Sequence, residues 1–245
     1  MKKLILVAVT LLTYQISFAQ FGDLLKKAGD KVNSVVKGGG LSQVDVGNGL
    51  KEALNIGLSE ATDFLSAKDG YFKSPYKILV PTEAQAVVSK LKFVPGFNNV
   101  EADLTERMNR AAEDAAIKAK PIFIDAIKKM SFGDAMSILT GNNDAATKYL
   151  EKTTSADLVA AFKPIIQESL DKVNARTYWR DAVSAYNKIP FVSKTNPELD
   201  DHVTTAALQG MFALVAKKEL AIRTDSSLRS TDLLKKVFAK QDKKQ

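Results

Sequence analysis

The feature that most constrains the fold of this chain is a long apolar stripe near its middle. Between Asp103 and Gly141, apolar residues recur at steps of three and four, the period of a helix with one buried face. The positions are Leu104, Met108, Ala111, Ala115, Ala119, Ile122, Ala126 and Met130. Pro121 is placed to kink such a helix or to begin a new one. We therefore expect this stretch to be helical and to lie at the centre of the core.

Start and stop signals predict further helices along the rest of the chain. Ser131 and Asp134 form a serine-x-x-acid start signal, with Gly141 as the stop. Asn143 and Ser155 are placed to cap two successive helices, a short one and a longer one. The expected helices cover about residues 21–37, 50–65, 83–93, 143–150, 155–173, 197–223 and 230–238. The stripe of the helix beginning near Pro197 runs through Leu199, Val203, Ala206, Gly210 and Leu214.

No stretch alternates apolar and polar residues for long enough to build a sheet, so the expected fold class is all-α. We expect a single compact multi-helix domain over residues 45–240. A short amphipathic arm over residues 20–44 precedes it and includes the flexible Gly38-Gly39-Gly40 linker. Residues 241–245 form a basic tail.

The first nineteen residues are typical of a secretory signal peptide. Met1-Lys2-Lys3 is positive, an apolar run follows from Leu4 to Leu12, and Ser17 to Ala19 offers small residues for cleavage. The alternative is a retained membrane anchor, but the apolar run is short for a bilayer. We expect a soluble periplasmic or secreted protein that begins at Gln20.

Composition excludes several classes of site. There is no cysteine, which excludes disulfides, thiol catalysis, cysteine-bound metals and a lipid anchor on an N-terminal cysteine. No phosphate loop, dinucleotide fingerprint or zinc-protease motif is present, and we expect no cofactor.

The formal charge of +7 is concentrated at the C-terminus, where residues 217–245 contain nine basic and four acidic residues. We therefore expect no nucleic-acid partner. A weak contact between this tail and an anionic surface is a further expectation. In the last helix, Lys235, Lys236 and Lys240 should face water. The opposite face, which should dock on the body, consists of Leu233, Leu234, Val237 and Phe238.

Several phrases, in order along the chain, resemble one known family. They are Leu50-Lys-Glu-Ala-Leu54, Asn109-Arg-Ala-Ala-Glu113, Pro121-Ile-Phe123, Asp144-Ala-Ala-Thr-Lys-Tyr149, Tyr186-Asn187, Pro197-Glu-Leu-Asp200 and Thr231-Asp-Leu-Leu-Lys-Lys-Val-Phe238. The chain resembles the bacterial exported family catalogued as domain of unknown function 4197, over roughly residues 49–238. The resemblance implies a helical envelope protein and no known activity. Some relatives look like lipoproteins, and the absence of cysteine departs from that pattern.

A candidate polar pocket lies on the central helix. Arg107, Arg110 and Glu113 could combine a carboxylate with an arginine clamp. The alternative, which we favour, is a solvated ladder of ion pairs four residues apart. Its pairs would be Asp103 with Arg107, Glu106 with Arg110, and Asp114 with Lys118.

The densest aromatic group, Tyr178, Trp179 and Tyr186, is a candidate contact for a ligand or partner, although core packing is the stronger alternative. The single histidine, His202, follows Glu198, Asp200 and Asp201. A metal site is conceivable there, but acids at a helix start also stabilise the helix dipole. We favour the dipole interpretation and expect no metal.

These observations lead to two hypotheses for function. The first is a non-catalytic binding or interaction module of the cell envelope, with a protein, peptide or lipid as the unknown partner. The second is a carboxylate-dependent hydrolase-like enzyme acting on an envelope substrate, with Glu113 and Asp114, or Asp200 and Asp201, as acid and base. Convergence of Arg107, Arg110 and Glu113 with Tyr178, Tyr186 or Asp200 in one buried pocket would favour the enzyme.

Overall fold

The computed structural model describes residues 42–81, 85, 88–89, 99–188, 190–191, 194–229 and 231–242. The chain divides into two units, Met1–Leu41 and Ser42–Gln245, and the described residues belong to the second. The expected signal segment and nearly all of the expected arm lie outside the described residues. So do most of the helix expected over residues 83–93 and the last three residues of the tail.

The described part of the chain is all-α, which confirms the expected fold class, and it contains no β-strand. Its α-helices are α2 (Gln43–Ser66), α4 (Val100–Ala116), α5 (Ala119–Lys129), α6 (Phe132–Thr140), α7 (Ala145–Asp171), α8 (Ala175–Tyr186), α9 (Leu199–Thr224) and α10 (Asp232–Asp242). A 3₁₀ turn, η2 (Ser226–Leu228), precedes α10.

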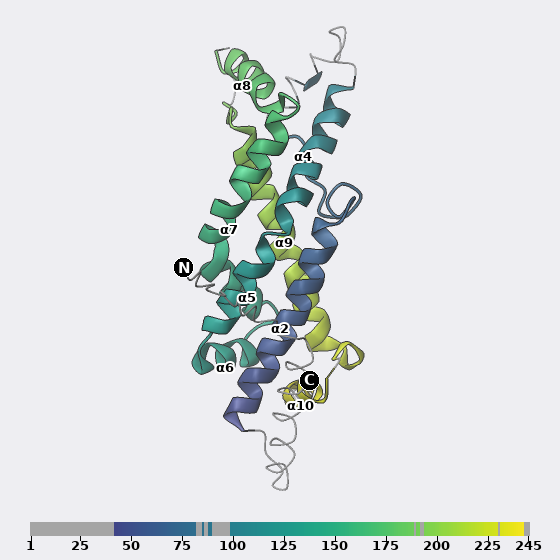
Figure 1. Ribbon diagram of the computed structural model, residues 1–245, viewed down its shortest axis with the longest axis vertical. Helices are drawn as coiled ribbons and strands as arrows, with labels where there is room; N and C mark the ends of the chain where they lie inside the picture. The colour runs from purple at the N-terminus through teal and green to yellow at the C-terminus, as the bar shows by residue number, and fades with distance from the viewer. Residues whose placement is uncertain are drawn as a thin grey trace, which may run out of the picture. The chain divides into compact units, whose positions relative to one another are not determined.

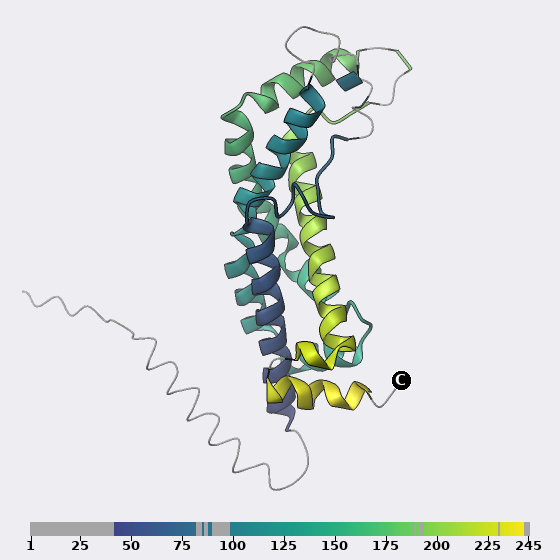
Figure 2. The same cartoon turned by 90° about the vertical axis from the view of Figure 1, so that its right-hand side faces the viewer.

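Four helices, α2, α4, α7 and α9, lie side by side and build the core (Figures 1 and 2). Helix α7 packs against both α4 and α9, and α9 also packs against α2. Met108, Phe162 and Ile166 are among the side chains with no exposed surface. Each large apolar side chain buried in this way stabilises the fold by roughly 1.5–3 kcal/mol.

The central stripe is helical and largely buried, but the expectation of one continuous stripe is wrong. The helix ends at Ala116, and α5 begins three residues later, with Pro121 in its first turn. The break resets the helical phase, so Phe123 and Ile127 are buried in α5, whereas Ile122 and Ala126 are only half-buried.

The two helices expected over residues 143–150 and 155–173 are one helix, α7, with Pro164 inside it. Ser155 does not cap, because its hydroxyl donates to the carbonyl of Glu151 in the preceding turn. A serine can satisfy its hydroxyl in this way without ending a helix, which is why the cap signal misled the prediction.

The start signal at Ser131 is confirmed. Its hydroxyl accepts from the Asp134 N–H at 3.1 Å, and the Asp134 carboxylate accepts from the Ser131 N–H at 2.9 Å. The Ser131 hydroxyl also donates to that carboxylate at 2.7 Å, and this bond, together with the one from the Ser131 N–H, holds the pKa of the Asp134 carboxyl below its usual value. The stop at Gly141 is also confirmed, because a Cβ there would approach the Ser137 carbonyl oxygen to 2.7 Å.

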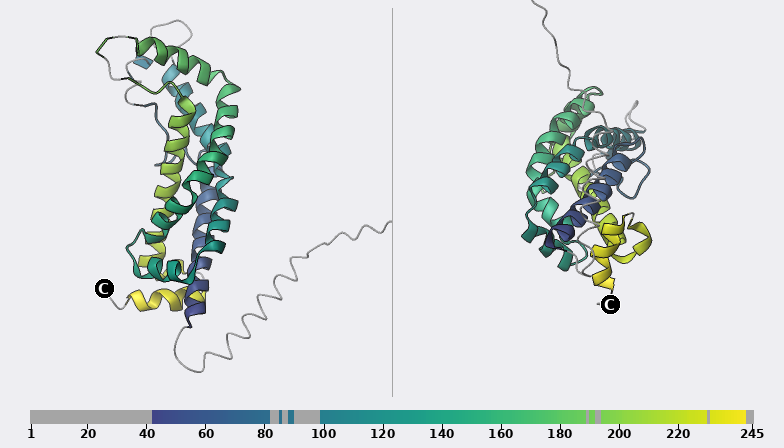
Figure 3. Two further views of the ribbon diagram at one scale, coloured as in Figure 1. Left: turned by 90° about the vertical axis from the view of Figure 1, so that its left-hand side faces the viewer. Right: turned by 60° about the horizontal axis from the view of Figure 1, so that its bottom comes forward.

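Helix α10 crosses the N-terminal part of α2 (Figure 3). Leu234, Val237 and Phe238 are buried there, while Lys235 and Lys236 are exposed, as expected. Leu233 is half-buried, and the side chain of Lys240 lies outside the described part of the structure. A Cβ on Gly49 of α2 would approach Val237 to 2.8 Å, so the close crossing requires glycine. Among the described helices, none has the length and apolar content needed to cross a membrane.

Candidate binding surface

Residues 69–81, between α2 and the next described helix, form an irregular segment that we call the braced loop. It begins with Asp69 in the left-handed region at φ 72°, followed by Gly70. A Cβ on Gly70 would come within 2.2 Å of the Phe64 carbonyl oxygen, so only glycine fits. Arg110 of α4 donates to the Asp69 carboxylate at 2.7 Å and thereby lowers the pKa of that carboxyl.

Glu113 of α4 fixes the next two residues of the braced loop. Its side chain is buried, and Oε1 accepts from the N–H groups of Tyr71 at 3.1 Å and Phe72 at 3.0 Å. Oε2 accepts from Arg110 Nη1 at 2.7 Å. The bond to Glu113 raises the pKa of the Arg110 guanidinium above its ordinary value. Both carboxylate oxygens are therefore used to shape the loop.

Asn109, one residue before Arg110, holds the far end of the braced loop. Its Oδ1 accepts from the Ile78 N–H at 2.8 Å, and its Nδ2 donates to the Ile78 carbonyl at 2.7 Å. The amide side chain thus replaces the neighbouring strand of a sheet. Burial alternates from Lys77 to Val80, as it does in a β-strand: Ile78 and Val80 are buried, and Lys77 and Leu79 are exposed.

The braced loop also contacts α9. The buried Tyr71 hydroxyl donates to the Ala207 carbonyl at 2.8 Å, and burial raises the pKa of that hydroxyl. A Cβ on Gly210 would lie 3.2 Å from Tyr76 Cβ, so the loop sits close to the helix there. His202 Nε2 lies 2.9 Å from the Leu79 carbonyl oxygen. Because a carbonyl oxygen can only accept, Nε2 carries the proton in this contact.

An open groove of about 650 Å³ runs between the braced loop and α9, and we call it the α9 groove. On the loop side it is lined by residues 75–81. On the helix side it is lined by His202, Ala206, Gln209, Gly210 and Ala213. The expectation that Ala206 and Gly210 lie in the buried stripe of α9 is therefore wrong: both are half-buried at the groove, and the buried residues are Ala207 and Met211.

The residues of the predicted polar pocket separate in the structure. Arg110 and Glu113 form an ion pair beneath the braced loop, whereas Arg107 lies on the exposed face of α4. Arg107 and Arg110 line a second groove, between α4 and α7, whose volume is about 410 Å³. Of the expected ladder only Glu106 with Arg110 is present, at 3.4 Å. Asp114 instead accepts from the Ser169 hydroxyl.

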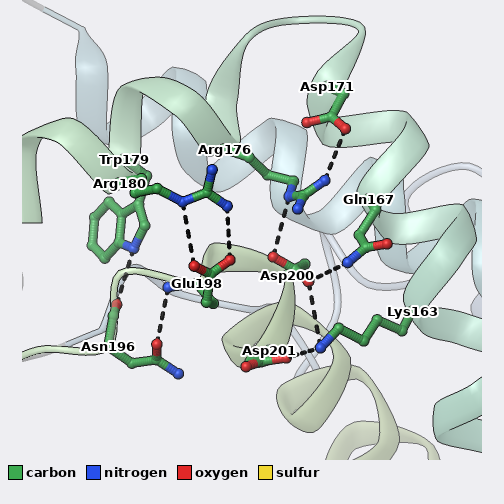
Figure 4. Close-up of polar contacts among 10 residues, drawn as sticks. All are labelled: Lys163, Gln167, Asp171, Arg176, Trp179, Arg180, Asn196, Glu198, Asp200 and Asp201. Atoms are coloured by element: carbon green, nitrogen blue, oxygen red, sulfur yellow. Dashed lines mark hydrogen bonds and ion pairs between the residues drawn. The ribbon is translucent and has the colours of Figure 1, made fainter.

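The predicted aromatic group lies on α8, and its members differ in exposure. Trp179 is buried, and its indole N–H donates to the Asn196 carbonyl at 3.2 Å (Figure 4). Tyr178 and Tyr186 are half-buried, and burial raises the pKa of the Tyr178 hydroxyl. Trp179 therefore joins α8 to the segment that leads into α9.

The predicted acids Asp200 and Asp201 lie in a separate polar cluster where α7, α8 and α9 meet (Figure 4). Asp200 is only 1% exposed and accepts from Gln167 at 2.8 Å and from Arg176 at 3.2 Å. Asp201 pairs with Lys163 at 2.6 Å. Burial raises the pKa of Asp200, but the bond from Gln167 and the nearby cations outweigh it, so the net pKa is lowered.

Two further ion pairs complete this cluster. Arg176 also donates to Asp171 at 2.8 Å, and Arg180 binds both carboxylate oxygens of Glu198, at 3.2 and 2.9 Å (Figure 4). No hydrogen bond or ion pair among the described residues joins this cluster to Glu113. The residues proposed for the enzyme therefore belong to two separate networks. The described residues also include no group of three or more histidines and acids that could hold a metal ion.

Of the residues that hold the braced loop, only Arg110 and Glu113 were among the candidate site residues predicted from the sequence. Asn109 was not among them, although it begins one of the phrases, Asn109-Arg-Ala-Ala-Glu113, on which the family resemblance rests. The sequence holds no comparable signal for residues 77–80, because three of these four residues are apolar and only their burial alternates.

The comparisons with known proteins agree with the resemblance seen in the sequence. A family model described as "Protein of unknown function (DUF4197)" matches residues 40–239. No curated protein and no solved structure matches the chain.

Proposed function

The chain belongs to the DUF4197 family of proteins of unknown function, and from that premise we propose that it is an exported, non-catalytic binding or interaction module of the cell envelope. The observation that carries this proposal is that buried side chains hold the braced loop in a fixed, irregular conformation. The partner of the protein binds at the surface formed by this loop and the α9 groove.

Three buried polar side chains support this choice of surface. Asn109, Glu113 and Tyr71 direct their hydrogen bonds to or from a segment that has no regular secondary structure of its own. With the braced loop held in this way, the side chain of Leu79 is 61% exposed at the edge of the α9 groove. Loops that a rigid scaffold holds in place carry binding functions more often than the scaffold does. A loop that is already ordered also loses less entropy when a partner binds.

The state of the acids favours binding over the hydrolase-like alternative. Glu113 accepts two backbone N–H groups and one arginine N–H, and Asp200 accepts from Gln167 and Arg176. A general base must be free to take a proton from a substrate. These carboxylates instead tie elements of the fold together.

The location and the tail remain part of the proposal. The signal-like first nineteen residues support export to the periplasm or beyond. The exposed Lys235 and Lys236 on α10 support a weak contact with an anionic surface. Such a contact would weaken as salt is added.

Photo-crosslinking in living cells tests the proposed function. A photoreactive amino acid replaces Leu79 in the braced loop, and in a matched control it replaces Leu228, which is 51% exposed in η2. A third position, Tyr186, tests the aromatic group on α8. We expect one reproducible envelope partner from position 79, identified by mass spectrometry, and none from position 228. The absence of a partner at position 79, together with turnover of an envelope substrate that Glu113→Gln abolishes, would contradict the proposal.

A further inference from the structure

The braced loop presents one edge of its backbone without a full set of hydrogen bonds. The N–H and C=O of Ile78 both face Asn109 on α4. In an extended chain the same groups of the neighbouring residues face the opposite way. The contact between the Leu79 carbonyl and His202 of α9 agrees with this. Among the described residues, the Leu79 N–H and the Lys77 carbonyl have no hydrogen-bond partner.

The α9 groove gives a peptide backbone room beside this edge. Its floor is made of Ala206, Gln209, Gly210 and Ala213, and three of these four side chains are small or absent. A volume of about 650 Å³ lies in the range typical of ligand sites. An unpaired extended edge in such a groove is the arrangement to which peptides add as a further strand.

The charge of the α9 groove selects among peptides. Its ionisable lining side chains are Tyr76, Lys77 and His202, and none of its described lining residues is a carboxylate. The Lys77 ammonium lies 4.9 Å from the centre of the Phe72 ring and forms no ion pair with a described carboxylate. Lys217 is exposed one turn beyond Ala213, on the same face of α9. The groove is therefore complementary to negative charge.

We propose that the α9 groove binds an extended, acidic peptide segment of a partner protein, which adds to the braced loop as a β-strand. This inference rests on the proposed function and names the class of partner. One peptide carbonyl accepts from the Leu79 N–H, and one peptide N–H donates to the Lys77 carbonyl. The side chains that face the helix are small or aliphatic and rest on α9. The acidic side chains meet Lys77 and Lys217.

The first test uses a peptide library as the probe. The purified protein selects from nonapeptides in which fixed valines alternate with randomised residues. We expect Asp and Glu to be enriched at the randomised positions. Enrichment of Lys and Arg, or no enrichment, would overturn the proposal.

The second test probes the backbone of the best selected peptide, with affinity measured by fluorescence anisotropy. A single N-methyl group is placed on each central amide in turn. Methylation of the amide that faces the braced loop should weaken binding by about tenfold, while methylation of the amides on either side should change it little. Equal tolerance at every position would show that the peptide does not bind as a strand.

Variants of the protein provide matched controls. Leu79→Pro removes the N–H and is compatible with an extended Ile78, so affinity should fall by about tenfold. Leu79→Ala keeps the N–H and should lose less. Ala213→Glu places an acid in the groove and should weaken binding, whereas Leu220→Glu, exposed on α9 outside the groove, should not. If Leu79→Pro fails to fold, the comparison of Ala213→Glu with Leu220→Glu still tests whether an acidic peptide binds in the α9 groove.

The outcomes separate this inference from the proposed function. A partner crosslinked at position 79 whose binding is insensitive to peptide N-methylation would leave the function intact and overturn the strand. Vesicle binding or self-association through the α9 groove, in place of peptide binding, would overturn it too. Failure of the crosslinking itself would instead count against the proposed function.

Discussion

The side-chain amide of Asn109 and the backbone of Ile78 form a two-point hydrogen bond, with Oδ1 at 2.8 Å from the Ile78 nitrogen and Nδ2 at 2.7 Å from its oxygen. A third bond joins Nδ2 to the Thr105 carbonyl at 2.6 Å. Asn109 has no exposed surface. One residue of α4 therefore holds a strand-like segment in place without a sheet.

Replacing Asn109 by alanine should destabilise the protein by about 3 kcal/mol, because the Ile78 N–H and C=O lose their partners while still buried. Urea denaturation measures the loss. The control is Asn99→Ala, since Asn99 is exposed and its side chain does not cap α4; this change should stay within about 0.5 kcal/mol. Equal losses for the two variants would contradict the role assigned to Asn109.

Glu113→Ala should cost about 3 kcal/mol, because it leaves the N–H groups of Tyr71 and Phe72 without their acceptor and removes one of the carboxylates that pair with Arg110. The neighbouring Asp114→Ala removes an exposed acid and should cost little. Thermal denaturation of both variants checks the difference. A Glu113→Ala variant as stable as the parent protein would show that the carboxylate does not hold the loop.

Glu219 and Arg223, one turn apart on α9, bind the end of α6 and the beginning of α7 through hydrogen bonds. Glu219 accepts from the N–H groups of Ala146 and Thr147 in the first turn of α7, both at 2.9 Å. Arg223 donates to the carbonyls of Ile138 and Leu139 in α6, at 2.7 and 3.3 Å. The two side chains pair at 2.8 Å and are buried. They thus satisfy groups that two helix ends leave open.

Glu219→Ala should therefore cost about 3–5 kcal/mol, because a buried guanidinium loses its counter-ion. The double variant with Arg223→Ala should lose less than the sum of the single losses, as measured by urea denaturation. Lys218→Ala breaks only a surface pair with Glu60 and should cost about 0–1 kcal/mol. Strict additivity of the first two changes would refute the coupling.

Asp200→Asn should destabilise the protein by about 2 kcal/mol at pH 7, because Gln167 and Arg176 lose a charged acceptor. The pKa of Asp200 is lowered in the folded state, so its carboxylate stabilises the fold above the unfolded pKa of about 3.9. That contribution disappears as the pH falls through the folded pKa. The difference between variant and parent should shrink between pH 7 and pH 3 in urea denaturation. An unchanged difference would mean that the charge of Asp200 is not what stabilises the cluster.

The helical fold could be predicted from the sequence because the signals that begin, continue and end a helix lie close together in the sequence. The stripe, the Ser131 cap and the Gly141 stop each depend on residues a few positions apart. The predictions of helix boundaries and buried faces were wrong where contacts between residues far apart in sequence determine them. The phase change in α5 follows from the break after Ala116, and α7 continues through Ser155 because other helices pack along its full length.

The binding surface could be predicted only in part. Arg110 and Glu113 were found because they lie about one turn apart on the helix and carry opposite charges. Their role was missed because the Tyr71 and Phe72 N–H groups that they serve lie about 41 residues away in sequence. Leu79 carries no chemical signal at all, since an exposed leucine becomes informative only when the groove beside it is seen.

Hydrogen exchange of three backbone amides, followed by NMR, tests the braced loop and its unpaired edge most directly. We expect slow exchange at Ile78 and Tyr71, whose N–H groups are bound by Asn109 and Glu113, and fast exchange at Leu79. Leu79 protected as strongly as Ile78 would mean that the edge is already paired. Ile78 exchanging as fast as Leu79 would mean that the loop is not braced, and either result would contradict the account.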